Sequence, residues 1–476
     1  MRVALANVQF HEGNNVFPPL GVLYVAAALR AAGHEVRVFD GDPEVRSGLA
    51  AEIAATNPDV VGFSFLTMTW ARAGTLIRQV RERLPGARLI AGGAHATADP
   101  TGTLRDLPLD AVVTGEGEIT ATDLLLRLEH GESWDGTPGV VTRVGAGPVR
   151  PFVESLDSLP FPARDLLGHE PYLRPPGLIR GWASSRIASM LAGRGCPFAC
   201  AFCESHRQMG TRVRMRSVAN VIAELDQLVR RDRIRGVYWV DDVFTHDRAW
   251  VLAFCAALRA RPYRLHWACQ SRVTAVDGAL LRAMRDAGCV QVDFGVESGS
   301  AGILKSMHKA ITPIQVEEAF SLARAVGVRT GASFILGSPG ETEEDLAATA
   351  ELARRIDSDW TIFFFSTPYP GTELYERTEA RWGAAWPAFG EQWNNRVGPT
   401  PLPHGGLDPG LVARTRARLQ NRHFARNYLH LRNLPFMLRL AGTLPHPDVR
   451  AAMARVAVAG RLDEVVEAAF STWRRP

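Results

Sequence analysis

Three cysteines in one short segment are the residues whose types and spacing most directly imply chemistry. Cys196, Cys200 and Cys203 stand in the stretch Gly195-Cys-Pro-Phe-Ala-Cys-Ala-Phe-Cys203, with Cys-x3-Cys-x2-Cys spacing. Thiolates are the soft ligands that hold iron–sulfur clusters in proteins. Four irons need four ligands and this segment supplies three, so one iron stays open for a small molecule, as in a catalytic metal site. The spacing therefore predicts a four-iron four-sulfur cluster with one open iron.

A zinc site is the alternative for these cysteines, with His206 as a fourth ligand. Zinc sites built from cysteine usually pair two Cys-x2-Cys motifs, and the chain has no second pair. The other three cysteines, Cys255, Cys269 and Cys289, stand in patterns typical of a helix and of strands. We expect them to be buried, inert thiols.

The cysteine segment is positioned by a regular alternation of strand and helix patterns. Six apolar segments typical of buried parallel strands follow residue 185: Arg186–Leu191, Gly236–Val240, Arg264–Gln270, Val290–Val296, Arg329–Leu336 and Trp360–Ser366. Six such β/α units predict a partial (β/α)6 barrel over residues 185–385. Barrel enzymes place their chemistry at the carboxyl ends of the strands. The cysteine segment follows the first strand and is expected at that end.

An earlier α/β unit is predicted over residues 1–135. Its five strand patterns are Val3–Val8, His34–Phe39, Val60–Phe65, Arg88–Ala91 and Ala111–Thr114. Helical patterns such as Leu20–Ala32 and Ala71–Leu84 lie between them. This alternation predicts a doubly wound parallel sheet, in which ligands bind at the carboxyl ends of the strands.

Two further segments complete the α/β chain. Residues 136–184 are rich in Gly, Pro and Ser and are expected to form a linker. Residues 386–476 turn to amphipathic helices such as Pro409–Tyr428 and Asp448–Arg474, and this helical C-terminal region is expected to contact the substrate. Trp382, Trp386 and Trp393 lie near its start but do not identify a molecule.

The bulk composition excludes several classes of protein. The 476 residues carry a net charge of +4 that is spread along the chain, which does not indicate a nucleic-acid partner. No run of 18 apolar residues is free of charge, so no membrane span is expected. The start, MRVALANVQF, reads as a strand rather than a signal peptide. Six cysteines are too few for a secreted disulfide framework, so we expect a cytoplasmic protein with reduced thiols.

The cysteine spacing after a first barrel strand resembles the radical S-adenosylmethionine superfamily, and the resemblance extends along most of the barrel. It implies that the amine and carboxylate of S-adenosyl-L-methionine chelate the open iron. It also implies that an electron from the cluster breaks the sulfonium bond and gives a 5′-deoxyadenosyl radical. An electron donor such as flavodoxin or ferredoxin is implied as a partner.

The same resemblance gives roles to residues at the first three strand ends. Phe202 would lie against the adenine, and the alternative is a core aromatic. Asp241 and Asp242 would reach the methionyl amine, and the alternative is structural capping. Arg272, which ends the third strand together with Gln270, would pair with the methionyl carboxylate, because guanidinium suits planar carboxylates; the alternative is an ion pair on the barrel rim.

Two later strand ends complete the implied site. Glu297, in Gly295-Val-Glu297-Ser-Gly, would bind the ribose hydroxyls. Gly337, in Phe334-Ile-Leu-Gly-Ser-Pro-Gly-Glu341, would let the backbone approach the adenine. Glu341 is expected to start the next helix, since acidic side chains favour helix N-termini.

Four motifs in the first unit resemble the cobalamin-binding domain that precedes the barrel in one branch of this superfamily. They are Pro18-Pro-Leu-Gly-Val-Leu-Tyr24, Gly62-Phe-Ser-Phe-Leu-Thr-Met-Thr69, Gly92-Gly-Ala-His95 and Gly115-Glu-Gly-Glu118. Small residues at strand ends let a corrin and its nucleotide tail approach the backbone. The implied contacts are Leu20, Ser64, Thr67, Met68, Thr69, Gly92, Gly93, His95, Gly115, Glu116 and Gly117.

The segment after the first strand departs from that family's pattern. Many corrinoid domains carry Asp-x-His-x-x-Gly, whose His binds cobalt from below, and this chain has Gln9-Phe-His-Glu-Gly-Asn14. We therefore expect His11 to be an ordinary loop residue. The lower face of the corrin would instead be covered by the loop Thr67–Trp70.

Together the resemblances imply a cobalamin-dependent radical S-adenosylmethionine enzyme. The favoured function is a methyltransferase that adds a methyl group from methylcobalamin to an unactivated carbon of a small metabolite. One alternative is a rearrangement or cyclisation in which cobalamin donates no methyl group. Another, from a different class, is a corrinoid carrier or sensor without catalysis.

Overall fold

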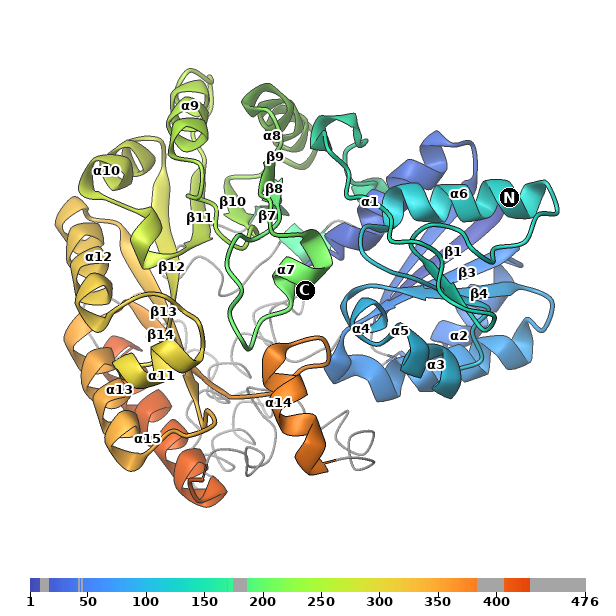
Figure 1. Ribbon diagram of the computed structural model, residues 1–476. Coiled ribbons are helices and arrows are strands. Elements are labelled where there is room, and N and C mark those ends of the chain that lie inside the picture. The colour runs from blue at the N-terminus through green and yellow to red at the C-terminus, as the bar shows by residue number, and fades with distance from the viewer. Residues whose placement is uncertain are drawn as a thin grey trace, which may run out of the picture.

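The computed structural model describes residues 1–8, 17–41, 43, 46–168, 170–173, 186–382 and 406–428. Within these ranges the chain forms an N-terminal α/β lobe and an open β/α barrel (Figure 1). His11, Trp386, Trp393 and the segment Asp448–Arg474 lie outside the described residues. None of the helices in the described ranges is both long enough and apolar enough to cross a membrane.

The N-terminal sheet has six strands in the order β2-β1-β3-β4-β5-β6. Their bounds are β1 Arg2–Val8, β2 Glu35–Gly41, β3 Val60–Phe65, β4 Arg88–Gly92, β5 Ala111–Val113 and β6 Val140–Thr142. The first five are parallel, which confirms the predicted doubly wound sheet. β6 pairs antiparallel with β5 and lies in the segment expected as a linker. Because this strand is only three residues long, its sequence pattern did not stand out.

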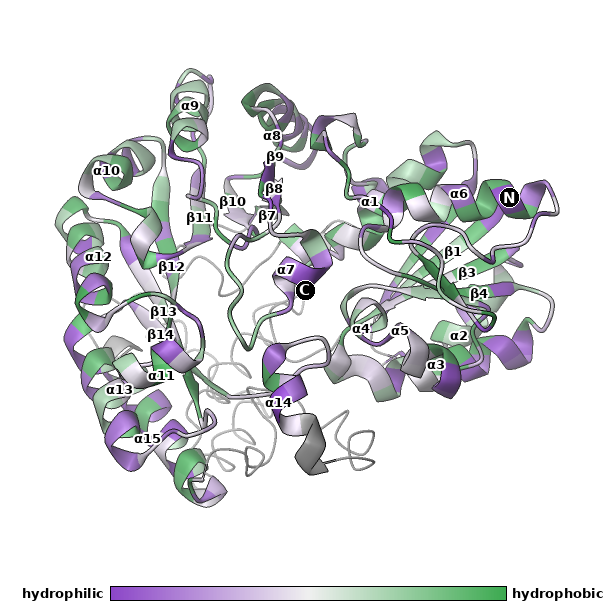
Figure 2. Ribbon diagram, in the orientation of Figure 1, coloured by the Kyte–Doolittle hydropathy of each residue, from purple (hydrophilic) through white to green (hydrophobic). Residues whose placement is uncertain are grey.

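Helices cover both faces of this sheet, and alternate strand side chains enter two separate cores. On one face lie α1 (Leu20–Ala31) and α6 (Gly117–Glu129), which pack on Val3 and Leu5. On the other lie α2 Leu49–Ala55, α3 Trp70–Arg83, α4 Ala94–Ala98 and α5 Pro100–Asp106. Hydrophobic and hydrophilic residues alternate along these helices, as Figure 2 shows in green and purple.

The second sheet forms the predicted partial barrel, with all six strands parallel in the order β14-β13-β12-β11-β10-β7. The strands are β7 Ile187–Met190, β10 Gly236–Trp239, β11 His266–Ser271, β12 Cys289–Glu297, β13 Arg329–Leu336 and β14 Trp360–Phe365. They form a crescent whose open side faces the N-terminal lobe (Figure 1). The predicted strands agree with these bounds to within a few residues, since buried parallel strands are near-continuous apolar runs.

Helices cover the outer side of the crescent. They are α8 Val218–Asp232, α9 Arg248–Arg259, α10 Gly278–Asp286, α12 Pro313–Val326, α13 Glu343–Ile356 and α15 Pro409–Tyr428. Large aromatic side chains fill the space between strands and helices: Trp239 meets Phe254 edge-on, and Phe334 stacks on Phe363. The last helix has the predicted bounds, and the helix α14 (Glu373–Trp382) precedes it.

One small element near the cysteines was not predicted. The two-residue strands β8 (Gly193–Arg194) and β9 (Arg214–Met215) pair antiparallel and form a hairpin base. The chain between them, residues 195–213, is named here the cluster loop. It carries all three clustered cysteines and the short helix α7 (Ser205–Met209). Strands this short give no sequence pattern, so only the fold reveals them.

Candidate functional site

The cluster loop begins at a glycine that no other residue can replace without strain. Gly195 has φ +100°, and a Cβ there would lie 2.3 Å from the carbonyl oxygen of Arg212. The loop then closes on itself, because the Cys196 amide donates to the Gly210 carbonyl over 3.0 Å. It is also tied to the barrel, since the Ala201 amide donates to the Met307 carbonyl over 3.0 Å. The three cysteines are therefore held by backbone contacts.

The thiols of the cluster loop fit a metal cluster. All three are free of disulfides, and burial raises the pKa of Cys203 to about 11 and raises the pKa of Cys196. A metal cation is needed to keep such thiols ionised. Among the described residues, no three His, Cys, Asp or Glu side chains are arranged to hold a single metal ion.

The remaining cysteines lie away from the loop in the barrel core. Cys255 is on α9, and Cys269 and Cys289 are on β11 and β12. All three are buried, and the Cys289 thiol donates to the Gln291 carbonyl over 3.5 Å. The structure thus brings none of them to the cluster loop, in agreement with their expected role as core thiols.

Arg272 presents an unpaired cation at the site. Its side chain follows β11 and is 4% exposed, yet Nε and Nη2 have no hydrogen-bond partner among the described residues. The guanidinium carbon lies 3.9 Å from the ring centroid of Phe198, which stands between Cys196 and Cys200 in the cluster loop. A buried guanidinium is costly without an anion or acceptors. The rim ion pair considered from the sequence is not formed among the described residues, so this position suits an anionic ligand.

The two acidic residues after β10 have different surroundings. Asp241 is buried and accepts hydrogen bonds from the amides of Ala192, at 3.0 Å, and Gly193, at 2.6 Å. Burial raises its pKa to about 7. The carboxylate therefore holds the turn that leads into the cluster loop, which is the structural alternative rather than a ligand contact. Asp242 is exposed, accepts from Ser205 Oγ over 3.0 Å, and remains open to a ligand.

A buried lysine that sequence reasoning missed pairs with Glu297. Lys309 Nζ lies 2.6 Å from Glu297 Oε1, and both side chains are buried. Glu297 has φ +69°, and a Cβ on Gly295 would lie 2.8 Å from the lysine nitrogen. One carboxylate oxygen is thus occupied within the chain, which qualifies the expectation that Glu297 serves the ribose hydroxyls alone. A signal was present, because Lys305 and Lys309 are the only lysines in the sequence.

Phe202 and the end of β13 border the same region. Phe202 packs against a small cluster formed by Ile303, Met307, Ile335 and Phe364, and Lys309 Nζ lies 5.9 Å from its ring centroid. The Phe202 ring therefore contacts side chains at the barrel end and lies near Lys309 of the Lys309–Glu297 pair. The amide nitrogen of Gln270 donates to the Tyr238 hydroxyl over 3.4 Å.

Glu341 differs from its predicted role. It accepts hydrogen bonds from the amides of Gly337, at 2.5 Å, and Ser338, at 3.1 Å. The helix that follows begins two residues later and is capped by Thr342 instead. Burial raises the pKa of Glu341 to about 7. The carboxyl group therefore shapes the loop around Gly337, whose φ is +83°, and does not start the helix.

The predicted corrinoid contacts after β3 and β4 converge on one end of the N-terminal sheet. Gly93 has φ +86°, and a Cβ there would lie 2.7 Å from Ser64 Oγ. Thr67–Thr69 forms a short 3-10 turn, and His95 Nδ1 lies 3.0 Å from Thr67 Oγ1. This end carries small and hydroxyl side chains, which fit the edge of a large planar ligand.

His95 is held as a neutral ring. It is buried, its ring centroid lies 4.6 Å from that of Trp70, and burial lowers its pKa to about 4. Met68 and Leu66 complete the turn, and Leu66 is half-exposed at the open end. The loop Thr67–Trp70 and His95 therefore pack against each other.

The motif after β5 differs from its expectation. Glu116 was expected to contact the corrinoid, but it accepts hydrogen bonds from the side chains of Arg194 and Arg214 and from the Val153 amide. These partners belong to the hairpin base and to the segment after β6. Gly117 lacks a Cβ because one would lie 3.0 Å from Val25 on α1. The Glu116 side chain therefore faces the barrel.

Comparisons with known proteins agree with this geometry. A family model for the B12 binding domain matches residues 8–125, and a model for the radical SAM superfamily matches residues 190–353. An uncharacterised methyltransferase of Pyrococcus horikoshii is 35% identical over 366 residues, which cover 75% of this chain and 78% of the relative. The anaerobic magnesium-protoporphyrin IX monomethyl ester cyclase of Rubrivivax gelatinosus is 29% identical over 398 residues, covering 79% and 70%.

A solved structure shares the fold. The radical S-adenosylmethionine methyltransferase TsrM of Kitasatospora setae, with cobalamin and a four-iron four-sulfur cluster bound, matches with a TM-score of 0.67. The match covers 80% of this chain and 79% of that chain at 20% identity. Both lobes and their order along the chain are therefore those of a known architecture.

Proposed function

The chain belongs to the cobalamin-dependent radical S-adenosylmethionine enzymes, and on that basis we propose that it is a methyltransferase that adds a methyl group from methylcobalamin to an unactivated carbon of a small metabolite. Its cofactors are cobalamin, a four-iron four-sulfur cluster and S-adenosyl-L-methionine. When bound, they supply hydrogen abstraction through the 5′-deoxyadenosyl radical and a transferable methyl group. The methyltransferase among the relatives supports this choice.

The observation that carries the proposal is the contact between the cluster loop and the cobalamin-binding lobe. A Cβ on Gly371, in the loop after β14, would lie 3.1 Å from the Cβ of Ala98 and 3.7 Å from Glu204 Oε2. Ala98 ends the helix that carries His95, and Glu204 follows Cys203. The two cofactor regions thus border one junction. Transfer between them needs reacting groups within bonding distance, which this junction favours.

Three side chains are assigned to S-adenosyl-L-methionine in this proposal. Arg272 pairs with the methionyl carboxylate, because no residue in the described ranges pairs with its Nε or Nη2. Asp242 receives the methionyl amine, because Asp241 is occupied by backbone amides. Glu297 keeps one oxygen for a ribose hydroxyl while Lys309 holds the other.

The corrinoid is assigned to the open end of the N-terminal sheet. Its proposed contacts are Leu20, Ser64, Thr67, Met68, Thr69, Gly92, Gly93, His95, Gly115 and Gly117. An electron donor such as flavodoxin or ferredoxin belongs to the proposal, because the cluster must be reduced before each turnover. A cytoplasmic location belongs to it as well, since three thiolates must stay reduced. Residues 386–476, of which the structure describes 406–428, are the proposed source of substrate contacts.

The experiment that tests the function is anaerobic incubation of the reconstituted protein with S-adenosyl-L-methionine, a reductant and candidate metabolites. A substrate should gain the mass of one methylene group. A ring-forming reaction is the second candidate, because a cyclase is among the relatives. It would give a product of unchanged carbon count together with 5′-deoxyadenosine. Absence of 5′-deoxyadenosine under all conditions would favour a carrier or sensor.

A further inference from the structure

A buried group of charged side chains joins the base of the cluster loop to the cobalamin-binding lobe. We name it the interface network, and its members are Glu116, Glu118, Arg164, Arg194, Arg214, Arg216 and Glu224. Each of these side chains is 7% exposed or less. Buried ion pairs are costly, because both charges lose their hydration, unless their geometry is excellent and further hydrogen bonds are made. We therefore expect this buried network to serve a function.

Glu116 is the member that holds both arms of the hairpin. Arg194 stands on β8, before the cluster loop, and its Nη1 donates to Glu116 Oε1 over 2.9 Å. Arg214 stands on β9, after the cluster loop, and its Nη1 donates to both carboxylate oxygens at 2.9 and 3.0 Å. The Val153 amide also donates to Glu116, over 2.7 Å. One carboxylate of the N-terminal lobe thus grips the two ends of the loop that carries the cluster ligands.

Glu118 and Tyr24 secure one arm only. Glu118 Oε1 accepts from Arg194 Nη2 over 2.5 Å, and the guanidinium of Arg194 lies 5.0 Å from the ring centroid of Tyr24. Burial raises the pKa of Tyr24 to about 12, so its hydroxyl stays neutral. Glu118 lies in the first turn of α6, which belongs to the cobalamin-binding lobe. Glu116 therefore contacts an arginine on each strand of the hairpin, whereas Glu118 contacts the arginine on β8.

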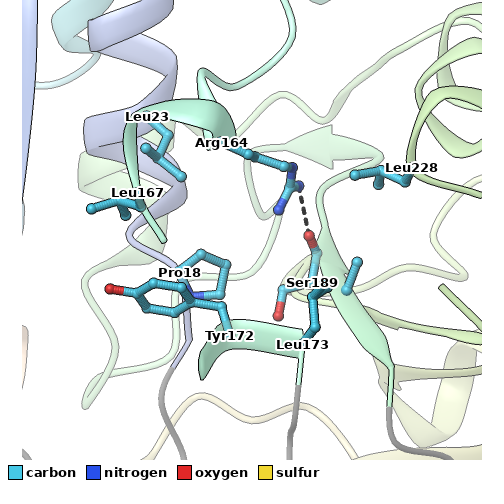
Figure 3. Close-up of a pocket in the computed structure, with 9 residues that line it drawn as sticks. Pro18, Leu23, Arg164, Leu167, Tyr172, Leu173, Ser189 and Leu228 are labelled. Carbon is cyan, nitrogen blue, oxygen red and sulfur yellow. Dashed lines mark hydrogen bonds between the residues drawn. The ribbon is translucent and has the colours of Figure 1, made fainter. Parts of the chain in front are cut away.

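A second set of pairs continues the network behind the hairpin. Arg216 donates to Glu224 over 2.6 Å, and Arg164 donates to the same carboxylate over 3.2 Å and to the Ser189 carbonyl over 2.7 Å. Figure 3 shows Arg164 pointing to Ser189 across a small cavity lined by Pro18, Leu23 and Leu228 among others. The cavity offers about 10 Å³ to the centre of a water molecule, which is room for one water. The cavity is therefore too small for a cofactor or substrate, and this part of the interface joins the two lobes.

From this geometry we propose that Glu116 is a positioning residue: it fixes the cluster loop relative to the corrinoid lobe through Arg194 and Arg214. The proposal rests on the proposed function, in which a radical formed beside the cluster meets a group held on the corrinoid. Apolar contacts would join the lobes equally well but would resist sliding less, whereas paired charges fix one register. A misplacement of about 1 Å can lower the rate of such a transfer about 100-fold.

The test uses Glu116→Gln, which keeps the shape of the side chain and weakens its hold on both arginines. The readout is the magnetic interaction between cob(II)alamin and the reduced cluster, measured by pulsed electron paramagnetic resonance on the reconstituted protein without substrate. We expect unchanged iron and cobalamin content but a broader or shifted distribution of cobalt–cluster distances. Glu118→Gln, which loosens one arm, should give a smaller change in the same direction.

A matched control comes from the far end of the same helix. Glu129→Gln removes an exposed carboxylate that pairs with the N-terminal amine, and it should leave the distance distribution as in the wild type. If Glu116→Gln does not fold, Glu118→Gln decides alone. Wild-type distance distributions in every folded variant of this pair would overturn the proposal. Because the distance is measured without turnover, failure of the methyltransferase assignment leaves this result readable on its own.

Discussion

The guanidinium of Arg272 stacks on the ring of Phe198 with 3.9 Å between the guanidinium carbon and the ring centroid. Phe198 lies between two cluster cysteines, and Arg272 follows the third strand of the barrel. The contact therefore connects the cluster loop to the end of β11, where we propose that an anionic ligand binds. In the part of the chain that the structure describes, Nε and Nη2 of this guanidinium have no hydrogen-bond partner.

Arg272→Met should weaken binding of S-adenosyl-L-methionine. Hydrogen bonds to a charged group contribute about 1.5–3 kcal/mol, which corresponds to a loss of about 10- to 100-fold in affinity. The free energy of unfolding of the ligand-free protein should change by less than about 1 kcal/mol, because loss of stacking and removal of an unpaired cation oppose each other. Equilibrium dialysis and denaturant unfolding check the two parts. Arg282→Met, at an exposed position on α10, is the control. Wild-type affinity in the Arg272 variant would rule out the carboxylate pairing.

Gly93→Ala should abolish cobalamin binding and spare the cluster. A Cβ there would lie 2.7 Å from Ser64 Oγ, and φ +86° is strained for any other residue. Such backbone strain costs about 1–3 kcal/mol and distorts the open end of the sheet. The measurement is cobalamin and iron content per chain after anaerobic reconstitution. Gly86→Ala is the matched control, since no atom lies within 4 Å of its added methyl group. Full cobalamin content in the Gly93 variant would contradict the assignment of this end.

His95 should make the stability of the cobalamin-free protein depend on acid. Burial lowers its pKa from 6.5 to about 4, so between these values the unfolded chain binds a proton that the folded chain does not. Stability is then lost as the pH falls from about 6.5 to about 4, by up to about 3 kcal/mol. His95→Gln should flatten this part of the pH profile. Chemical denaturation of both proteins at several pH values measures it, and identical slopes would show that His95 is not held neutral.

The Lys309–Glu297 pair predicts a double-mutant cycle. Removing one partner leaves a buried unpaired charge, which costs about 3–5 kcal/mol, whereas removing both together is nearly neutral. Lys309→Met should therefore be more destabilising than the double change Lys309→Met with Glu297→Gln. Thermal or denaturant unfolding of the apo proteins gives the comparison. Equal loss in the single and double variants would mean that the 2.6 Å contact is not an energetic pair.

The positions of the strands and of the site could be read from the sequence because both rest on local patterns. Apolar runs mark buried parallel strands, and ligands in such folds bind at the carboxyl ends of the strands. The roles of Gly93, His95 and Arg272 came in addition from the family resemblance of the motifs that follow those strands. The direction of a side chain at a strand end is not local. Glu116 turns toward Arg194 and Arg214, which lie far away in the sequence, and Asp241 turns back to the backbone of Ala192.

Strands of two or three residues could also not be predicted from the sequence. The hairpin of β8 and β9 has two residues in each strand, and β6 has three. Lys309 belongs to no motif, and its burial follows from the close approach of the segment after α11 (Ala301–Ser306) to the end of β12. Its rarity in a chain with 54 basic residues was the one available signal.

The cluster ligands give a prediction independent of substrate. Protein reconstituted without oxygen should hold about four irons per chain, and replacing Cys196, Cys200 and Cys203 by Ala should remove them. Cys255→Ala should leave the iron content intact, because that thiol lies in the barrel core. Iron analysis with absorption spectroscopy is the measurement. A full cluster in the triple variant would refute the assignment of ligands.

The central claim is that two uses of S-adenosyl-L-methionine serve one methylated carbon. The most direct measurement is the ratio of products from anaerobic turnover with an identified substrate. The account predicts methylated product, S-adenosylhomocysteine and 5′-deoxyadenosine in equal amounts, with the substrate hydrogen recovered in 5′-deoxyadenosine. A product with an unchanged number of carbons, formed with 5′-deoxyadenosine but without S-adenosylhomocysteine, would contradict it.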